Sequence, residues 1–199
     1  MNPLVSLEQI GPGFGNAIAA SQSVFRSGLM ALSRPGTLIN VNSDAHVPVG
    51  IGAAANALLL ALLDQDVSLY LTPRHENAAN YFRFHTGCAL TTNPRDADFL
   101  LFGADDVLLN LAELKNGDEY SPDHSATVIR EVSGLEIGRG LKLRGPGIQG
   151  ETMVCASQLD INFIAQWQEL NKRLPRGVDI FFTCADQVCG LPRTTRIGN

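Results

Sequence analysis

The segment from Pro192 to Arg196 places two arginines and two threonines directly after an expected strand. Guanidinium groups form paired hydrogen bonds with phosphate and carboxylate groups, and neighbouring hydroxyl groups add further donors. The segment therefore suits an anionic ligand or an acidic partner surface, and its candidate contacts are Arg193, Thr194, Thr195 and Arg196. The alternative is an ordinary solvated tail after an edge strand, because two arginines and two threonines are a weak anion signature.

Four more residues suit chemistry with anions or protons: Arg26, Arg83, His85 and Arg144. His85 lies near the predicted carboxyl end of a helix, where the helix dipole favours imidazolium, so it is the best general acid–base candidate. The alternative is that His85 caps the free carbonyls of that helix. Arg144 precedes the Gly145-Pro146-Gly147 loop, whose backbone N–H groups can approach an anion, although a structural tight turn fits the same residues. Whether these arginines converge is left open by the sequence.

Motifs that would identify a complete catalytic site are missing from the sequence. The string Gly11, Gly13 and Gly15 has no preceding strand and lacks the GxGxxG register, so it predicts a flexible lead-in rather than a dinucleotide loop. The sequence has neither a GxxxxGK[ST] phosphate loop nor an HExxH zinc motif, and its cysteines and histidines lack metal-ligand spacing. We therefore expect no catalytic metal, and catalytic residues remain unassigned.

The remaining histidines and the cysteines are predicted to be surface and structural residues. His46, His75 and His124 stand in polar, loop-like surroundings, which indicates surface positions. Free cysteine is among the most buried residue types, and a reducing cytosol disfavours disulfides. We therefore expect buried thiols at all four positions: Cys88, Cys155, Cys184 and Cys189. The last two flank a predicted turn, across which they could approach.

Length and charge restrict the class of protein. With 199 residues, of which 45% are hydrophobic, the chain can bury one substantial core, so residues 1–199 are expected to form one domain. The formal net charge of -5 argues against nucleic-acid binding, which needs a basic face. Residues 1–15 lack the features of a secretory signal, and the apolar run at 49–63 is too short to span a membrane. A cytoplasmic protein without membrane or nucleic-acid partners is expected.

Helical and strand patterns alternate along the chain. Strands are predicted at 37–42, 67–71, 98–102, 127–132, 140–144, 178–184 and 188–191, and helices at about 16–33, 49–63, 72–84, 105–114 and 157–174. This alternation favours a three-layer α/β/α sandwich around a mixed, largely parallel sheet that ends in an antiparallel hairpin.

Two apolar patterns bear on packing. In the first predicted helix an apolar stripe is formed by Ile18, Phe25, Leu29 and Leu32, with Arg26 beside it. In the final hairpin, apolar residues alternate over two faces at Phe181, Phe182, Val188 and Leu191. That is more apolar surface than a water-facing edge needs, so part of the hairpin is predicted to pack against another subunit. Burial beneath helices of the same chain is the alternative.

Several short motifs follow one another in a distinctive order. They are Gln22–Arg26 with Met30-Ala31 and Pro35-Gly36, the small-residue entry into a helix after Gly50, Arg83–Gly87, Leu143–Ile148, Gly177–Asp179 and Pro192–Thr195. Together their order and spacing resemble the PhnH family, a subunit of the bacterial carbon-phosphorus lyase system that lets cells use phosphonates as a phosphorus source. The likeness runs nearly from end to end.

The resemblance implies a fold like the large domain of pyridoxal-phosphate-dependent transferases. That cofactor needs a lysine for its Schiff base. The lysines of this chain are Lys115, Lys142 and Lys172, which fall at predicted helix ends or on the wet face of a strand. We therefore expect neither pyridoxal phosphate nor another cofactor.

For function, the resemblance implies an accessory subunit of the complex that joins a phosphonate to the ribose carbon of ATP with loss of adenine. The implied partners are a second copy of the chain, PhnG, PhnI, PhnJ and possibly PhnL, with ATP and phosphonate as substrates of the complex. The alternatives are a free-standing nucleotide or phosphonate binding module that uses the arginines, and an independent transferase. The lack of a complete catalytic motif favours the accessory subunit.

Overall fold

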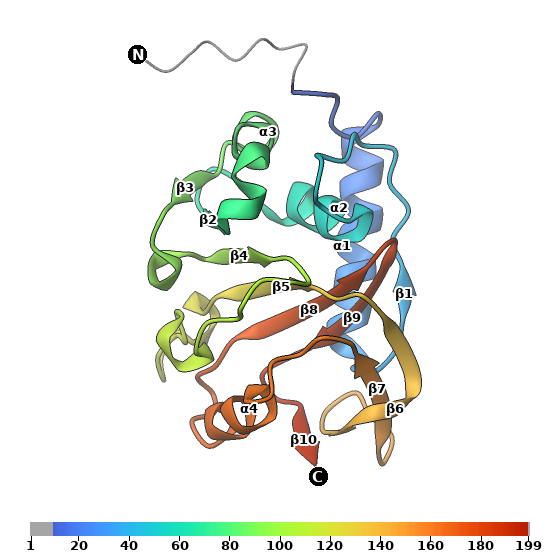
Figure 1. Cartoon of the computed structure of the whole chain (residues 1–199), viewed down its shortest axis with the longest axis vertical. Helices are drawn as coiled ribbons and strands as arrows, with labels where there is room; N and C mark the ends of the chain where they lie inside the picture. The colour runs from blue at the N-terminus through green and yellow to red at the C-terminus, as the bar shows by residue number, and fades with distance from the viewer. Residues whose placement is uncertain (1–9, 199) are drawn as a thin grey trace.

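The computed structural model describes residues 10–198, and its centre is a mixed β-sheet (Figure 1). The strands of this sheet are β1 (Ile39–Asn40), β2 (Ser68–Leu71), β3 (Ala89–Thr91), β4 (Phe99–Phe102), β5 (Thr127–Glu131), β8 (Asp179–Cys184) and β9 (Gln187–Leu191). Their spatial order is β1-β9-β8-β5-β4-β2-β3. The block from β8 to β3 is parallel, whereas β9 runs antiparallel to both β8 and β1. The prediction of a mixed, largely parallel sheet is confirmed.

Helices cover one face of the central sheet: α1 (Ala17–Ser33), α2 (Ala53–Leu62) and α3 (Ala79–Thr86). Asn16 caps α1 as expected, because its side chain accepts a hydrogen bond of 3.2 Å from the N–H of Ala19. Helix α1 lies very close to β9, where a Cβ on Gly190 would stand 2.5 Å from the backbone of Ala31. Only glycine permits this approach.

The opposite face is covered by a helix together with a second sheet, which corrects the expected α/β/α layering. This layer contains α4 (Phe163–Asn171), β6 (Leu135–Arg144), β7 (Thr152–Ala156) and β10 (Arg196–Gly198), with the strands in the order β10-β6-β7 (Figure 1). The physical reason is that Leu141, Leu143 and Val154 turn a band of apolar side chains toward the core. A small antiparallel sheet thus covers part of the central sheet where a helix was expected.

The predicted helix at 105–114 is wrong, because that segment forms an irregular loop and the short 3₁₀ helix Leu111–Glu113. A helix would need the carbonyl of Asp106 for the N–H of Asn110. In the structure the guanidinium of Arg130 donates to that carbonyl at 2.7 Å and to the carbonyl of Gly103 at 2.6 Å. The buried arginine therefore fixes the loop.

Other expectations change at the ends of elements. The predicted helix at 157–174 begins only at Phe163, and the one at 72–84 divides into the 3₁₀ helix Pro73–Ala78 followed by α3. After Pro192 the chain does not become a tail, because Arg196 enters β10 and pairs with β6. Within residues 10–198, no helix combines the length and apolarity needed to cross a membrane. The expectation of no secretory signal falls partly on residues 1–9, which lie outside the described residues.

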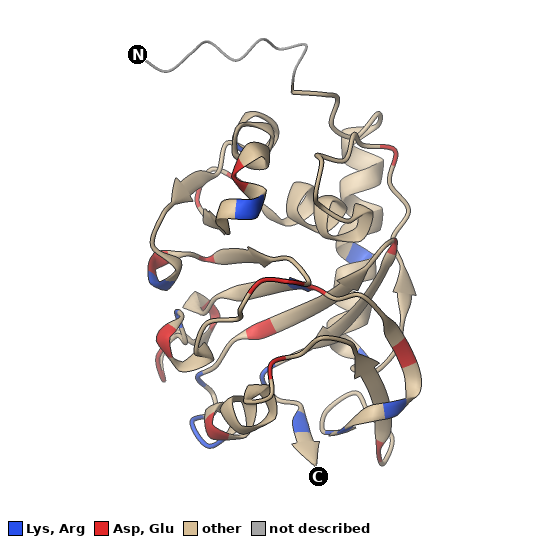
Figure 2. Cartoon of the chain, viewed as in Figure 1, with Lys and Arg blue, Asp and Glu red and all other residues tan. Residues whose placement is uncertain are grey.

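Of the two apolar patterns described from the sequence, the one in the hairpin is buried and most of the one in α1 is exposed. All four hairpin residues, Phe181, Phe182, Val188 and Leu191, are buried within the chain, so the alternative of burial beneath its own layers holds. In α1, by contrast, Ile18 is 86% exposed, Phe25 50% and Leu29 57%, because the helix packs on the sheet through its small residues Gly28 and Ala31. Figure 2 shows how little charge α1 carries.

Candidate functional site

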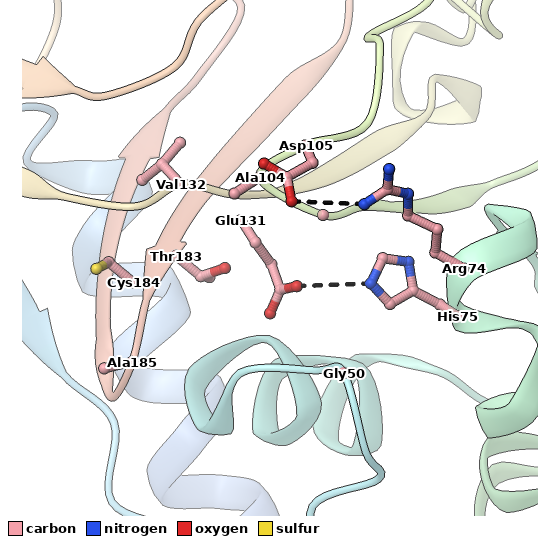
Figure 3. Close-up of a pocket in the computed structure, with 11 residues that line it drawn as sticks. Gly50, Arg74, His75, Ala104, Asp105, Glu131, Val132, Thr183, Cys184 and Ala185 are labelled. Carbon is pink, nitrogen blue, oxygen red and sulfur yellow. Dashed lines mark hydrogen bonds and ion pairs between the residues drawn. The ribbon is translucent and has the colours of Figure 1, made fainter.

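A cavity of about 460 Å³ opens where the parallel strands β4, β5 and β8 end (Figure 3). Its walls come from the last residues of β5 and β8, from the segments that follow the three strands, from the 3₁₀ helix after β2, and from Gly50 shortly before α2. Open parallel sheets bind ligands in this position, outside the carboxyl ends of their strands. The cavity is therefore the candidate functional site.

His75 is held in one orientation by Thr72 and Asp106. The Thr72 hydroxyl donates to the Asp106 carboxylate at 2.7 Å and lies 2.8 Å from Nδ1 of His75. A hydroxyl has one proton to give, so Nδ1 of His75 must donate to Thr72. In neutral imidazole this leaves Nε2 as an acceptor, and Nε2 faces the cavity 3.8 Å from a carboxylate oxygen of Glu131. Nε2 is thus the ring nitrogen of His75 that a ligand in the cavity can reach.

Glu131 ends β5 and turns its carboxyl group toward His75 (Figure 3). Burial raises the pKa of Glu131, although the N–H of Gly52, which donates to Oε1, and the nearby His75 both oppose the shift. Asp106 adds to the rise and Arg130 opposes it. Together, Glu131 and His75 can take up or deliver a proton at one wall of the cavity, which is the geometry of general acid–base chemistry.

Arg130 and Arg74 hold the acidic segment that follows β4. Arg130 is 3% exposed and donates to the carbonyls of Gly103, Ala104 and Asp106. Burial lowers the pKa of Arg130, and the neighbouring carboxylates oppose the shift, so the guanidinium stays charged. At the mouth of the cavity Arg74 pairs with Asp105 at 3.4 Å and with Asp106 at 3.5 Å. The loop that carries the carboxylates is therefore fixed from both sides.

The residues predicted from the sequence lie elsewhere. Arg26 is exposed on α1, and Arg83 is exposed on α3, where it donates to Asn80. His85 is half-buried with Nε2 3.0 Å from the carbonyl of Gly11, rather than bonded to the end of its own helix. That contact and the close approach of Gly13 to the His85 ring mean that the glycine string packs against α3 instead of forming a free lead-in.

The C-terminal candidates fall into two environments. Arg144 and Arg196 are partners across β6 and β10, and Arg144 also pairs with Glu151 at 2.5 Å. Arg193 is mostly enclosed and bonds to Asp179, whereas Thr194 is exposed and Thr195 is fully buried. None of the predicted residues lines the cavity described above. Their role as anion or partner contacts stays a prediction.

The main error in the site prediction is His75, which is 4% exposed rather than a surface residue. A signal was present in the sequence: Asp105 and Asp106 follow one expected strand, Glu131 ends the next, and His75 lies just after a third. Parallel strands bring such positions to one edge of the sheet. His46 and His124 are exposed as expected.

The described residues do not match what a metal ion or pyridoxal phosphate would need. Among residues 10–198, no group of three or more His, Cys, Asp or Glu side chains is arranged to hold a metal ion. None of the three lysines lines the cavity: Lys115 pairs with Asp98 at 2.6 Å, Lys172 pairs with Glu169, and Lys142 lies in β6. A Schiff base therefore has no amine in this cavity. The four cysteines are free thiols, of which Cys155 and Cys184 are only half-buried.

The fold and the site define an α/β protein with a mixed sheet and a pocket of titratable side chains at the carboxyl ends of its parallel strands. The family described as "Bacterial phosphonate metabolism protein (PhnH)" matches residues 12–198, and the chain belongs to this PhnH family. The chain is 32% identical to the "Alpha-D-ribose 1-methylphosphonate 5-triphosphate synthase subunit PhnH" of Rhizobium meliloti (strain 1021), over 92% of this chain and 93% of that protein. It is 33% identical to the "Putative C-P lyase subunit protein HtxG" of Stutzerimonas stutzeri, over 88% of this chain and 85% of that protein.

The raised pKa of Glu131 predicts a specific dependence of stability on pH. The folded chain retains a proton that the unfolded chain releases, so stability falls as pH rises from the ordinary carboxyl pKa through the raised value. Glu131→Gln has no such proton, and we expect its melting temperature to vary less than that of the wild type between about pH 5 and pH 8. The exposed Glu113→Gln is the matched control and should follow the wild-type curve. Parallel curves for Glu131→Gln and the wild type would contradict the assignment.

Proposed function

We propose that this chain is the PhnH subunit of a carbon-phosphorus lyase complex. In this role it is required, with PhnG, PhnI and PhnL, for transfer of the ribose triphosphate moiety of ATP to an alkylphosphonate. The observation that carries the proposal is the identity of 32% to a named synthase subunit, sustained over 92% of this chain and 93% of that protein. The chain acts in the cytoplasm as one domain and is accessory to the catalytic subunits.

Growth on methylphosphonate tests this role directly. A bacterial strain that lacks its own PhnH and receives this chain should grow with methylphosphonate as sole phosphorus source. A tagged copy of the chain should copurify with PhnG, PhnI and PhnJ. If neither growth nor copurification is observed, the proposal is wrong and the free-standing binding module becomes the better account.

The exposed face of α1 supports assembly through a second copy of the chain. Ile18, the polar Gln22, Phe25 and Leu29 follow one another at spacings of four, three and four residues, which is the spacing of the contact seam between two packed helices. Arg26 is the single charge on α1, so two copies related by a two-fold axis meet little like-charge repulsion (Figure 2). A shallow groove beside this seam is lined by Arg26, Met30 and Ile39. We therefore place the homodimer interface on α1.

Charges placed on this seam should abolish the dimer. We expect the double variant Phe25→Glu, Leu29→Glu to be monomeric at micromolar concentration, where the wild type is a dimer, because each copy would bury two unpaired carboxylates. Light scattering coupled to size-exclusion chromatography measures the mass. Ile161→Glu is the control, since Ile161 is 94% exposed and lies before α4 rather than on α1. A double variant that remains dimeric with an unchanged melting temperature would show that the interface lies elsewhere.

A further inference from the structure

Thr183, at the end of β8, has a buried hydroxyl that no part of the described chain satisfies. The residue is 1% exposed and lines the cavity, and its Oγ1 has no hydrogen-bond partner among residues 10–198. Its side chain points to the side of the cavity where Glu131 lies (Figure 3). Buried polar groups in proteins are nearly always hydrogen-bonded. An unpaired hydroxyl beside a cavity therefore points to a ligand that forms a hydrogen bond with it.

The space between Glu131 and His75 also suits a ligand group. Oε2 of Glu131 and Nε2 of His75 are 3.8 Å apart, which is too long for a hydrogen bond. Oε1 of Glu131 already accepts from the N–H of Gly52, so Oε2 is the oxygen free for a ligand. A hydroxyl can bridge this gap, because it can donate to one of these atoms and accept from the other once a proton sits there.

The charge and shape of the cavity select against phosphates and stacked rings. The lining carries the carboxyl groups of Asp105 and Glu131, and its one arginine, Arg74, is already paired with Asp105 and Asp106. The guanidinium of Arg130, behind the wall, is bonded to backbone carbonyls. A phosphate here would face these carboxylates at short range. Apart from these charged residues and His75, the walls are mostly small residues, among them Gly50, Ala104 and Ala185, and no Phe, Tyr or Trp side chain of the lining offers a flat surface for a base.

We propose that the cavity binds the adjacent hydroxyl groups of a sugar, as found in the cis-diol of ribose. One hydroxyl lies between Glu131 and His75, and the adjacent hydroxyl forms the missing hydrogen bond with Oγ1 of Thr183. Acidic side chains also bind ribose hydroxyls in dinucleotide-binding sheets, outside the carboxyl ends of the parallel strands. The choice of ribose rests on the proposed function, in which a ribosyl group is transferred. The triphosphate would remain outside the cavity, away from its carboxylates.

Calorimetric titration with three uncharged probes tests this site, in the chain alone and in the copurified complex. Adenosine carries the diol, 2′,3′-dideoxyadenosine lacks it, and adenine lacks the sugar. We expect adenosine to bind at least about tenfold more tightly than the other two, since two hydrogen-bonded hydroxyls are lost. Equal affinities for adenosine and dideoxyadenosine, or no adenosine binding to either preparation, would overturn the proposal.

Two substitutions locate the binding. Thr183→Val keeps the shape of the side chain and removes its hydroxyl, so adenosine should bind about tenfold more weakly, whereas Thr183→Ser should restore binding. Glu131→Gln replaces the free acceptor Oε2 with an amide that can donate, and it should weaken adenosine binding by a similar factor. Thr92→Val, at an exposed threonine outside the cavity, is the control and should bind as the wild type. Unchanged affinity in both cavity variants would place adenosine elsewhere.

The outcomes separate this inference from the function on which it rests. A chain that restores growth on methylphosphonate but shows no preference for the diol refutes the sugar site and leaves the subunit role intact. A chain that binds adenosine through Thr183 yet neither restores growth nor copurifies with the other subunits refutes the subunit role instead.

Discussion

Arg130→Met is expected to lower the free energy of unfolding by about 3–5 kcal/mol, the cost of breaking a buried charged network from one side. Methionine fills much of the arginine's volume but cannot donate to the carbonyls of Gly103, Ala104 and Asp106. Those carbonyls would stay inside the protein without partners. The segment after β4 should then lose its fixed conformation, and the cavity would lose the wall that carries Asp105.

Urea unfolding monitored by the fluorescence of Trp167, which is buried in α4, measures this change. Arg139→Met is the matched control, because Arg139 is 65% exposed and pairs only with the exposed Glu136. It should shift the free energy of unfolding by less than about 0.5 kcal/mol. Equal stability of the two variants would show that the carbonyls after β4 do not depend on Arg130.

Arg193→Ala should also destabilise the chain, by about 2–4 kcal/mol. The Arg193 guanidinium pairs with Asp179 at 2.5 Å and donates to Ser125 and to the carbonyl of Pro122. One side chain thus links the start of β8 to the segment before β5, and its removal leaves Asp179 partly buried without its partner. This expectation differs from the interpretation of the sequence, in which Arg193 is a candidate contact for an anionic ligand or an acidic partner.

Arg196→Ala provides the comparison within the same segment, since Arg196 is exposed in β10. Its melting temperature should stay near that of the wild type while that of Arg193→Ala falls by several degrees. If Arg193→Ala melted like the wild type and instead failed to bind an anion or a partner subunit, the interpretation from the sequence would be restored.

The elements that the sequence predicted well are those whose signals are local. Asn16 and the following apolar spacing mark the start of α1, and Gly87 closes α3 with a φ of 77°, as a helix-terminating glycine should. The hairpin of β8 and β9 follows from its apolar runs and the short polar turn between them. In each case neighbours along the chain determine the structure.

The site could not be predicted in the same way, because its residues meet only through the order of the strands. Thr72 is an unremarkable helix cap by sequence, yet in the fold its hydroxyl bonds to Asp106 and His75. The loop at 105–110 has the acidic residues of a helix start, and Arg130, more than twenty residues away, overrides that preference. The exposure of the apolar face of α1 could not be predicted either. An apolar stripe indicates that a helix face will be covered, but it does not show whether the same chain or another molecule covers it.

The close approach of α1 to β9 affects how readily the chain can aggregate in the cell. Gly190 lets the backbone of the helix rest directly on the strand, and such close packing restrains α1 and the apolar residues on its outer face. A rigid surface loses little conformational entropy when it is covered, which favours tight assembly. The same rigidity prevents the uncovered chain from folding its apolar residues inward. In the proposed assembly, a chain synthesised in excess of the other subunits would therefore be prone to aggregation through this exposed apolar surface.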